Sequence, residues 1–210
     1  MKKPDDTPLF PLLAISRLRM GIDGKGVTSL VAGAGCPLRC KWCINKKILQ
    51  NRQPEYVTPE TLFERLRIDN LYFQATGGGV CFGGGESLLH TPFIGAFRSL
   101  TGGAWKITAE TSLNVPEENV REARDCVDEF IVDIKTADPA IYRSYTGGEN
   151  GRALQNLTLL APYADRTVIR VPLIPSFNDG ADREKTVALM KSMGFETFDL
   201  FEYRVVDNSR

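Results

Sequence analysis

The chain has 210 residues, of which 42% are hydrophobic and 25% charged, and its net charge is zero. This composition is ordinary for one globular domain, and no apolar run approaches the roughly 20 residues that span a bilayer, which excludes a membrane protein. Five cysteines are an odd number, and no apolar signal segment precedes them, so a secreted disulfide framework is disfavoured and a cytoplasmic location is expected. We expect one domain over residues 1–210, with residues 1–14 as a loosely ordered N-terminal extension.

Strand and helix patterns alternate along the chain from residue 28 onward. The clearest helix start is Thr58, a favourable N-cap residue that is followed by Pro59. The predicted strands cover 28–34, 79–83, 105–110, 129–135, 167–172 and 197–202. The predicted helices begin at 59, 91, 117, 139, 151 and 181.

Strands that alternate with helices predict a parallel sheet, because each helix returns the chain to the same edge. Six such units are too few for a closed eight-stranded barrel. We therefore predict an α/β fold, a partial, open (β/α)6 barrel with parallel strands. In barrels of this type, functional residues gather at the C-terminal ends of the strands.

Three cysteines follow the first predicted strand closely. Cys36, Cys40 and Cys43 have the spacing C-x3-C-x2-C. Cubane iron–sulfur clusters usually take four cysteine ligands, so three suggest a cluster with one iron open to a ligand that is not protein. An open metal position is typical of catalytic rather than structural sites.

A structural zinc site is the alternative for these cysteines. Zinc needs four closed ligands, and the candidates for the fourth, His90, Cys81 and Cys126, lie far along the chain. The two close pairs that are typical of zinc sites are absent. We interpret Cys81 and Cys126 as structural residues and His90 as a packed surface residue.

Glycines and an acid follow the second of these strands, at Gly83, Gly84, Gly85 and Glu86. Glycines let backbone approach a ligand closely, and the carboxylate of Glu86 could accept a hydrogen bond from an ammonium group. A phosphate-binding loop is excluded, because an acid follows the glycines where that motif requires a lysine.

Charged residues also end the third and fourth strands, namely Glu110 with Thr111 and Asp133 with Lys135. Burying such groups is costly without partners, so they meet each other or a zwitterionic ligand. Arg170 on the next strand could bind a carboxylate through its planar guanidinium. An internal salt-bridge network that only holds the strands is an equally good interpretation.

The cysteine segment, with the aromatic Trp42 before its last cysteine, resembles the cluster loop of radical S-adenosylmethionine (SAM) enzymes. Further segments in the same order resemble the activating enzymes of glycyl radical enzymes, such as pyruvate formate-lyase activating enzyme. They are Asp23–Gly26, Gly78–Glu86, Glu110 with Thr111, Asp133–Lys135, Thr146–Asn150 and Arg170–Asp179. Lys25 departs from that pattern, which has proline at this position.

This resemblance implies an oxidoreductase that cleaves SAM reductively at a 4Fe-4S cluster on Cys36, Cys40 and Cys43. The resulting 5′-deoxyadenosyl radical would take a hydrogen atom from a glycine of a partner glycyl radical enzyme. The residues implied to bind SAM are Trp42, Gly84, Gly85, Glu86, Glu110, Thr111, Asp133, Lys135, Arg170 and Arg204. A monovalent cation near Glu110 and Thr111 is also implied, as are flavodoxin or ferredoxin as electron donor and an anaerobic setting.

Two other functions stay open at this point. The same radical could act on a small molecule or a peptide precursor, or the domain could be a non-catalytic, metal-stabilised interaction module. Residues 1–52 hold ten Lys or Arg and three Asp or Glu, a surplus that could offset an anionic cluster or be a solvated face. No RNA-binding motif accompanies it, so nucleic acid is not an expected partner.

Overall fold

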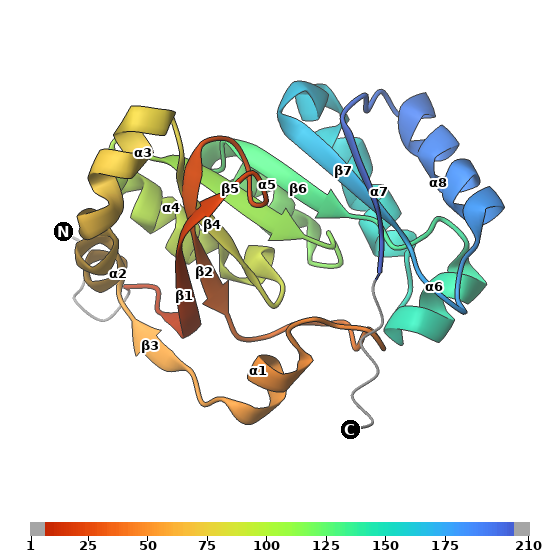
Figure 1. Ribbon diagram of the computed structural model, residues 1–210, viewed down its shortest axis with the longest axis horizontal. Helices are drawn as coiled ribbons and strands as arrows, with labels where there is room; N and C mark the ends of the chain where they lie inside the picture. The colour runs from red at the N-terminus through yellow and green to blue at the C-terminus, as the bar shows by residue number, and fades with distance from the viewer. Residues whose placement is uncertain (1–6, 204–210) are drawn as a thin grey trace.

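The computed structural model describes residues 7–203. These residues form one eight-stranded sheet in the order β3-β1-β2-β4-β5-β6-β7-β8, with helices packed against its outer face (Figure 1). The strands are β1 (Phe10–Met20), β2 (Val27–Gly33), β3 (Glu55–Val57), β4 (Gly79–Gly84), β5 (Lys106–Thr111), β6 (Glu129–Asp133), β7 (Thr167–Leu173) and β8 (Phe198–Glu202).

The sheet is an open barrel. Strands β2, β4, β5, β6, β7 and β8 form one parallel series, whereas β1 pairs antiparallel with both β2 and β3 at one end. Within residues 7–203, the terminal strands β3 and β8 do not pair with each other. The predicted partial, open (β/α)6 barrel is confirmed, with β1 and β3 as an addition.

Most of the helices cover the sheet and supply one side of the core. They are α1 (Lys46–Asn51), α2 (Pro59–Leu66), α3 (Asn70–Thr76), α4 (Thr91–Thr101), α5 (Glu117–Cys126), α6 (Pro139–Thr146), α7 (Gly151–Leu160) and α8 (Gly180–Ser192). Aromatic rings join helix and sheet, with the centroids of Phe82 on β4 and Phe97 on α4 5.6 Å apart. No helix in residues 7–203 is both long and apolar enough to cross a membrane.

Helix α2 begins as the sequence predicts. The Thr58 hydroxyl accepts from the amide of Thr61 at 3.2 Å and so satisfies one of the free donors of the first turn. Leu62 and Leu66 then face the core and are fully buried.

Strand β1 was not predicted, and it corrects the expected N-terminal extension. Residues 10–14 of that segment belong to the sheet, and Phe10 and Leu13 are buried. The Phe10 ring lies 5.6 Å from Phe82 and passes beside Gly33, where an added Cβ would be 2.5 Å from it. Residues 1–6 lie outside the described part of the chain.

The parallel strands bring the sequence motifs to one edge of the sheet. We call residues 34–45, between β2 and α1, the cysteine loop. It leaves the same edge at which β4 ends with Gly84, β5 with Thr111 and β6 with Asp133. All the strand-end motifs therefore share the C-terminal edge, as the fold prediction requires.

Candidate functional site

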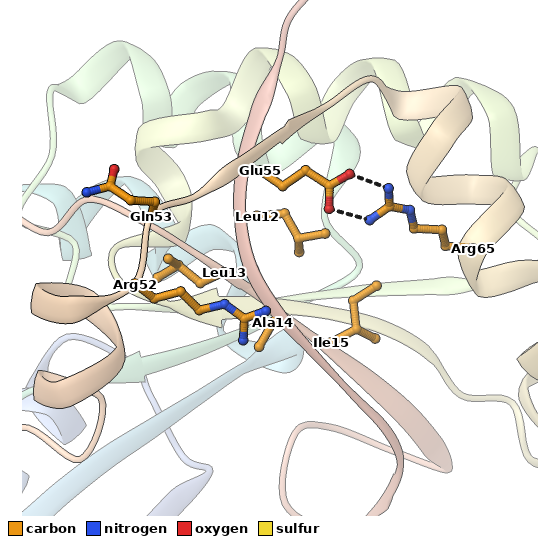
Figure 2. A pocket seen from close by; sticks show the side chains of 8 residues that line it. All are labelled: Leu12, Leu13, Ala14, Ile15, Arg52, Gln53, Glu55 and Arg65. Carbon is orange, nitrogen blue, oxygen red and sulfur yellow. Dashed lines mark hydrogen bonds and ion pairs between the residues drawn. The ribbon is translucent and has the colours of Figure 1, made fainter.

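A cavity of about 190 Å³ lies beside β1, away from the strand-end motifs (Figure 2). Its lining residues are Leu12, Leu13, Ala14, Ile15, Arg52, Gln53, Glu55 and Arg65. Glu55 and Arg65 pair across one wall, with 2.8 Å between Oε2 and Nη1. None of the predicted site residues lines this cavity, so the candidate site is at the strand ends.

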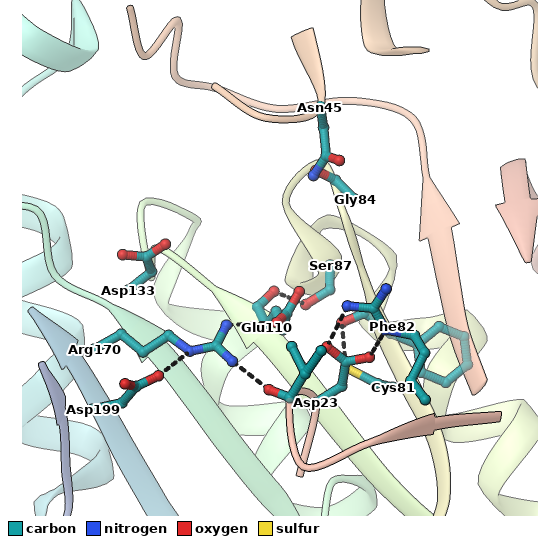
Figure 3. Close-up of polar contacts among 12 residues, drawn as sticks. Asp23, Asn45, Cys81, Phe82, Gly84, Ser87, Glu110, Asp133, Arg170 and Asp199 are labelled. Atoms are coloured by element: carbon teal, nitrogen blue, oxygen red, sulfur yellow. Dashed lines mark hydrogen bonds and ion pairs between the residues drawn. The ribbon is translucent and has the colours of Figure 1, made fainter. Parts of the chain in front are cut away.

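The glycine segment after β4 fixes the start of the cysteine loop. The amide of Gly85 donates to Gly33 O at 3.0 Å, and the amide of Glu86 donates to Gly35 O at 2.8 Å. A Cβ on Gly85 would stand 2.1 Å from Gly35 O, so only glycine fits there. From the other end of the loop, Asn45 Nδ2 donates to Gly84 O at 2.7 Å, as Figure 3 shows.

The middle of the cysteine loop crosses to the opposite side of the strand-end edge. The amides of Arg39 and Lys41 donate to the carbonyls of Thr146 and Tyr145, at 2.8 and 3.1 Å. These carbonyls belong to the last turn of α6, where free acceptors are expected. The Thr146–Asn150 segment thus supports the cysteine loop.

The three cysteines of the loop are free thiols. Cys36 is exposed, and Cys40 and Cys43 are half-buried. Burial raises the pKa of Cys40 to about 11, although the positive charge of Lys135 lowers it. In residues 7–203, no three His, Cys, Asp or Glu side chains are gathered closely enough to hold one metal ion. The thiols of a cubane cluster each bind a different iron, so three cysteines need not converge on one point to hold such a cluster.

The Glu86 side chain is buried and joins the ends of β4 and β5. Its carboxylate accepts from Thr111 Oγ1 at 2.6 Å, from Ser112 Oγ and N at 2.6 and 2.8 Å, and from the Leu88 amide at 3.2 Å. Burial raises the pKa of Glu86, and the hydrogen bonds from Ser112 and Thr111 partly reverse this. Protein donors occupy the acceptor sites of both oxygens, so a ligand ammonium would have to displace one of them.

Glu110 and Arg170 form an ion pair inside the barrel, with 2.6 Å between Oε1 and Nη1 (Figure 3). Arg170 also pairs with Asp199 at 3.1 Å and donates to Ile22 O in the β1–β2 connection. Burial raises the pKa of Glu110, which the charge of Arg170 counteracts. This arrangement matches the salt-bridge interpretation, and Glu110 already has a cation where a monovalent ion was expected.

Asp133 and Lys135 stand at the end of β6. Lys135 Nζ is buried, 2.5 Å from Asp133 Oδ2 and 2.9 Å from the Tyr203 hydroxyl. Burial lowers the pKa of Lys135, but the combined interactions with Asp133, Tyr203 and Cys40 outweigh this effect, and the net pKa is raised. Asp133 Oδ1 is buried and has no hydrogen-bond partner within residues 7–203. Because a buried acceptor without a partner is costly, a ligand donor at this oxygen would be stabilising.

The remaining predicted residues lie apart from these contacts. Trp42 is 41% exposed on the cysteine loop. His90 is half-buried, and its Nε2 lies 2.9 Å from Ala34 O at the start of that loop. Cys81 and Cys126 are buried. Arg204 lies outside the described residues.

Comparison with known families decides the class of this site. The radical SAM superfamily matches residues 30–190, well over half of the chain. The chain belongs to the radical SAM superfamily.

Curated radical SAM relatives include several activating enzymes. The (2S)-3-sulfopropanediol dehydratase activating enzyme of Klebsiella oxytoca is 36% identical over 121 residues, which span 57% of this chain and 38% of that enzyme. The pyruvate formate-lyase-activating enzyme of Clostridium pasteurianum is 28% identical over 193 residues, spanning 88% and 79%. The choline trimethylamine-lyase activating enzyme of Oleidesulfovibrio alaskensis is 27% identical over 221 residues, spanning 76% and 71%. The predicted resemblance to this group is confirmed.

Solved radical SAM folds match the structure as well. SuiB of Streptococcus suis superposes with a TM-score of 0.65 over 85% of this chain and 40% of its own, at 14% sequence identity. An identity this low supports the fold alone.

The donor set of this radical SAM chain fits an iron–sulfur cluster. Three free thiols lie on one loop, and the buried ammonium of Lys135 is close enough to Cys40 to lower the pKa of that thiol. Thiolates are the usual ligands of such clusters, and a neighbouring cation stabilises their negative charge.

Sequence reasoning missed Ser112 and Tyr203, which hold Glu86 and Lys135. Asn45, which holds Gly84, belongs to the resemblance to the activating enzymes, whose pattern has an asparagine two residues after the last cysteine. Ser112 and Tyr203 carried no signal, because only the folded chain brings them to their partners.

Proposed function

We propose that this chain is an activating enzyme that removes a hydrogen atom from a glycine Cα of a partner glycyl radical enzyme. One observation carries the proposal: a cysteine loop at the functional edge of the barrel, in a chain whose relatives over most of its length are named activating enzymes. The 4Fe-4S cluster, SAM and the partner enzyme are parts of this proposal.

Cys36, Cys40 and Cys43 would hold the cluster, with Lys135 as the cation beside Cys40. When bound, the cluster would supply the electron that cleaves SAM and yields a 5′-deoxyadenosyl radical. Asp133 Oδ1 is the acceptor best suited to a SAM donor, because it is buried and has no partner within residues 7–203. The Glu86 network would act indirectly, by holding the ends of β4 and β5 in place.

The glycyl substrate requires access to this edge from outside. The sheet does not close between β3 and β8 in the described part of the chain. An extended loop of a partner protein could therefore enter from the open side. We infer that a protein segment is the substrate, which agrees with the names of the relatives.

Anaerobic reconstitution with iron and sulfide tests the proposal. We expect brown protein with about four iron and four sulfide per chain, 5′-deoxyadenosine after reduction with SAM, and a glycyl radical signal in electron paramagnetic resonance when the partner is added. Cys43→Ala should abolish cluster and product, whereas Cys126→Ala, which changes a thiol outside the loop, should retain both.

Two results would contradict the proposal at different levels. If SAM is cleaved but no candidate glycyl radical enzyme gains a radical, the activating function fails and a small-molecule or peptide substrate is favoured. Colourless protein that binds only zinc would instead indicate the non-catalytic module.

A further inference from the structure

A second cavity, of about 130 Å³, lies at the end of the barrel opposite the strand-end motifs. Lys106, Glu129 and Thr167 line it, and they are the first residues of β5, β6 and β7. The connection between β1 and β2 contributes Lys25. Because functional residues of such barrels gather at the C-terminal edge, this cavity is separate from the candidate site.

Lys25 is a position at which the chain departs from the pattern of the activating enzymes, since a lysine stands where that pattern has proline. Lys25 and Lys106 are both exposed at the mouth of the cavity. Neither forms an ion pair with a carboxylate of residues 7–203. Two positive charges are therefore available to a ligand at this mouth.

Glu129 supplies the opposite charge at the inner side of the cavity, and only 9% of its surface is exposed. Within residues 7–203, its carboxylate takes part in no ion pair and no side-chain hydrogen bond. The backbone covers this carboxylate closely, since a Cβ on Gly24 would stand 3.6 Å from Glu129 Oε2. A buried carboxylate without a partner is costly, so a cationic group bound there would be stabilising.

The charges that line the cavity balance. They are three cations and three carboxylates, namely Lys25, Lys106, Arg166, Asp128, Glu129 and Asp165. Asp128 already pairs with Arg98, and Arg166 donates to two backbone carbonyls. Two lysines and two acids remain. The lysines would repel a simple cation and the acids a simple anion, whereas a molecule with both charges avoids both costs.

The size of the cavity limits the ligand as well. An apolar cavity of roughly 150 Å³ holds benzene, so the present volume of about 130 Å³ suits a molecule no larger than that. A metal ion is not favoured, because no three His, Cys, Asp or Glu side chains of residues 7–203 gather closely enough to hold one.

We propose that this cavity binds a small α-amino acid, with the ammonium group at Glu129 and the carboxylate at Lys25 and Lys106. The direction follows from burial, because the unpaired acid lies inside and the two lysines lie at the mouth. Hydrogen bonds between charged groups would form at both ends of the ligand. Alanine, which has as many non-hydrogen atoms as benzene, is the probe that fits the volume. The inference is independent of the proposed function.

Isothermal titration calorimetry with three probes tests the site. They are L-alanine, ethylamine, which has only the ammonium group, and propionate, which has only the carboxylate. The chain is reconstituted anaerobically, and SAM is present so that alanine does not bind at the open iron. We expect saturable binding of one alanine per chain, roughly tenfold or more tighter than either of the other probes, since each lacks one charged end. Cys43→Ala should bind alanine equally well, because the cysteine loop lies at the other end of the barrel.

Two variants and a matched control locate the binding. Glu129→Gln keeps the size of the side chain and removes its charge, and Lys25→Met removes an exposed cation. Each should weaken alanine binding roughly tenfold or more. Lys185→Met, which removes an exposed lysine on α8, should leave it unchanged.

Four results would overturn the proposal. The unaltered chain could bind no alanine, as expected if a lysine swings to Glu129 in a cavity that holds only water. Ethylamine or propionate could bind as tightly as alanine, which would assign the cavity to a simple ion. Lys25→Met, whose exposed position makes its folding secure, could bind alanine normally. Binding could also be lost in Cys43→Ala, which would place the alanine at the cysteine loop.

Discussion

Gly85→Ala is the sharpest test of how the cysteine loop is held. The new methyl group would stand 2.1 Å from Gly35 O, far inside van der Waals contact with backbone that cannot rotate away, and 3.1 Å from Gly33 O, a tight contact. The loop must therefore shift and lose the hydrogen bonds of Gly85 and Glu86 to those two carbonyls. Two such bonds correspond to about 1–3 kcal/mol, or a fall in Tm of roughly 2–12 °C for a chain of this size.

The assay for this variant has two parts, Tm and the iron content after anaerobic reconstitution, and both should fall. Gly95→Ala provides the control, because Gly95 lies within α4 and its added Cβ meets nothing within 4 Å. There alanine should raise stability by about 0.5–1 kcal/mol through its higher helix propensity. If Gly85→Ala keeps both the Tm and the iron content of the unaltered protein, the glycine segment does not support the loop as described.

Three further predictions concern the rest of the chain. Phe10→Ala should lower the free energy of unfolding, measured in urea, by about 3–5 kcal/mol, because it empties a fully buried site between β1 and β4. A change near zero would contradict the packing of β1 in the core. Arg170→Met leaves Glu110 without its cation and should cost about 3 kcal/mol at pH 8. Without Arg170, the folded pKa of Glu110 rises further above its unfolded value. The cost of the substitution is therefore small at pH 4, where Glu110 is protonated in both states, and it grows as the pH rises from the unfolded to the folded pKa. An equal cost at pH 4 and pH 8 would contradict the pairing. Cys81 and Cys126 are buried, and the pKa of Cys126 is raised to about 11. Iodoacetamide at pH 8 should therefore leave both thiols unlabelled in the folded protein and label them in urea, as measured by mass spectrometry. Labelling of both without urea would contradict their burial.

The repeating part of the fold could be predicted because each unit carries local signals. Thr58 followed by Pro59 predicts the start of α2, and the β-rich run before Cys36 predicts β2. Strand β1 gives no such signal. Its pairing with β2 contains two irregularities, and Leu18 has a positive φ of 54°, so no regular alternation of buried and exposed residues marks it.

The cysteines and strand-end residues of the site could be predicted as types, but their partners could not. Glu110 meets Arg170 across 60 positions of sequence, and Lys135 meets Tyr203 across 68. Such pairs depend on the order of strands in the sheet, which local patterns do not encode. The same holds for Glu86, whose conspicuous place after three glycines suggested a ligand contact, whereas the fold assigns its oxygens to Ser112, Thr111 and Leu88.

An open barrel has two edge strands that do not pair with each other, and the cysteine loop connects parts of the sheet that lie far apart in the strand order. That segment leaves β2, is fastened beside the end of β4, and reaches the last turn of α6, beyond two further strands in the sheet order. Iron bound by its cysteines would therefore be connected to both anchorages, and we expect amide exchange at α6 to slow when iron is incorporated.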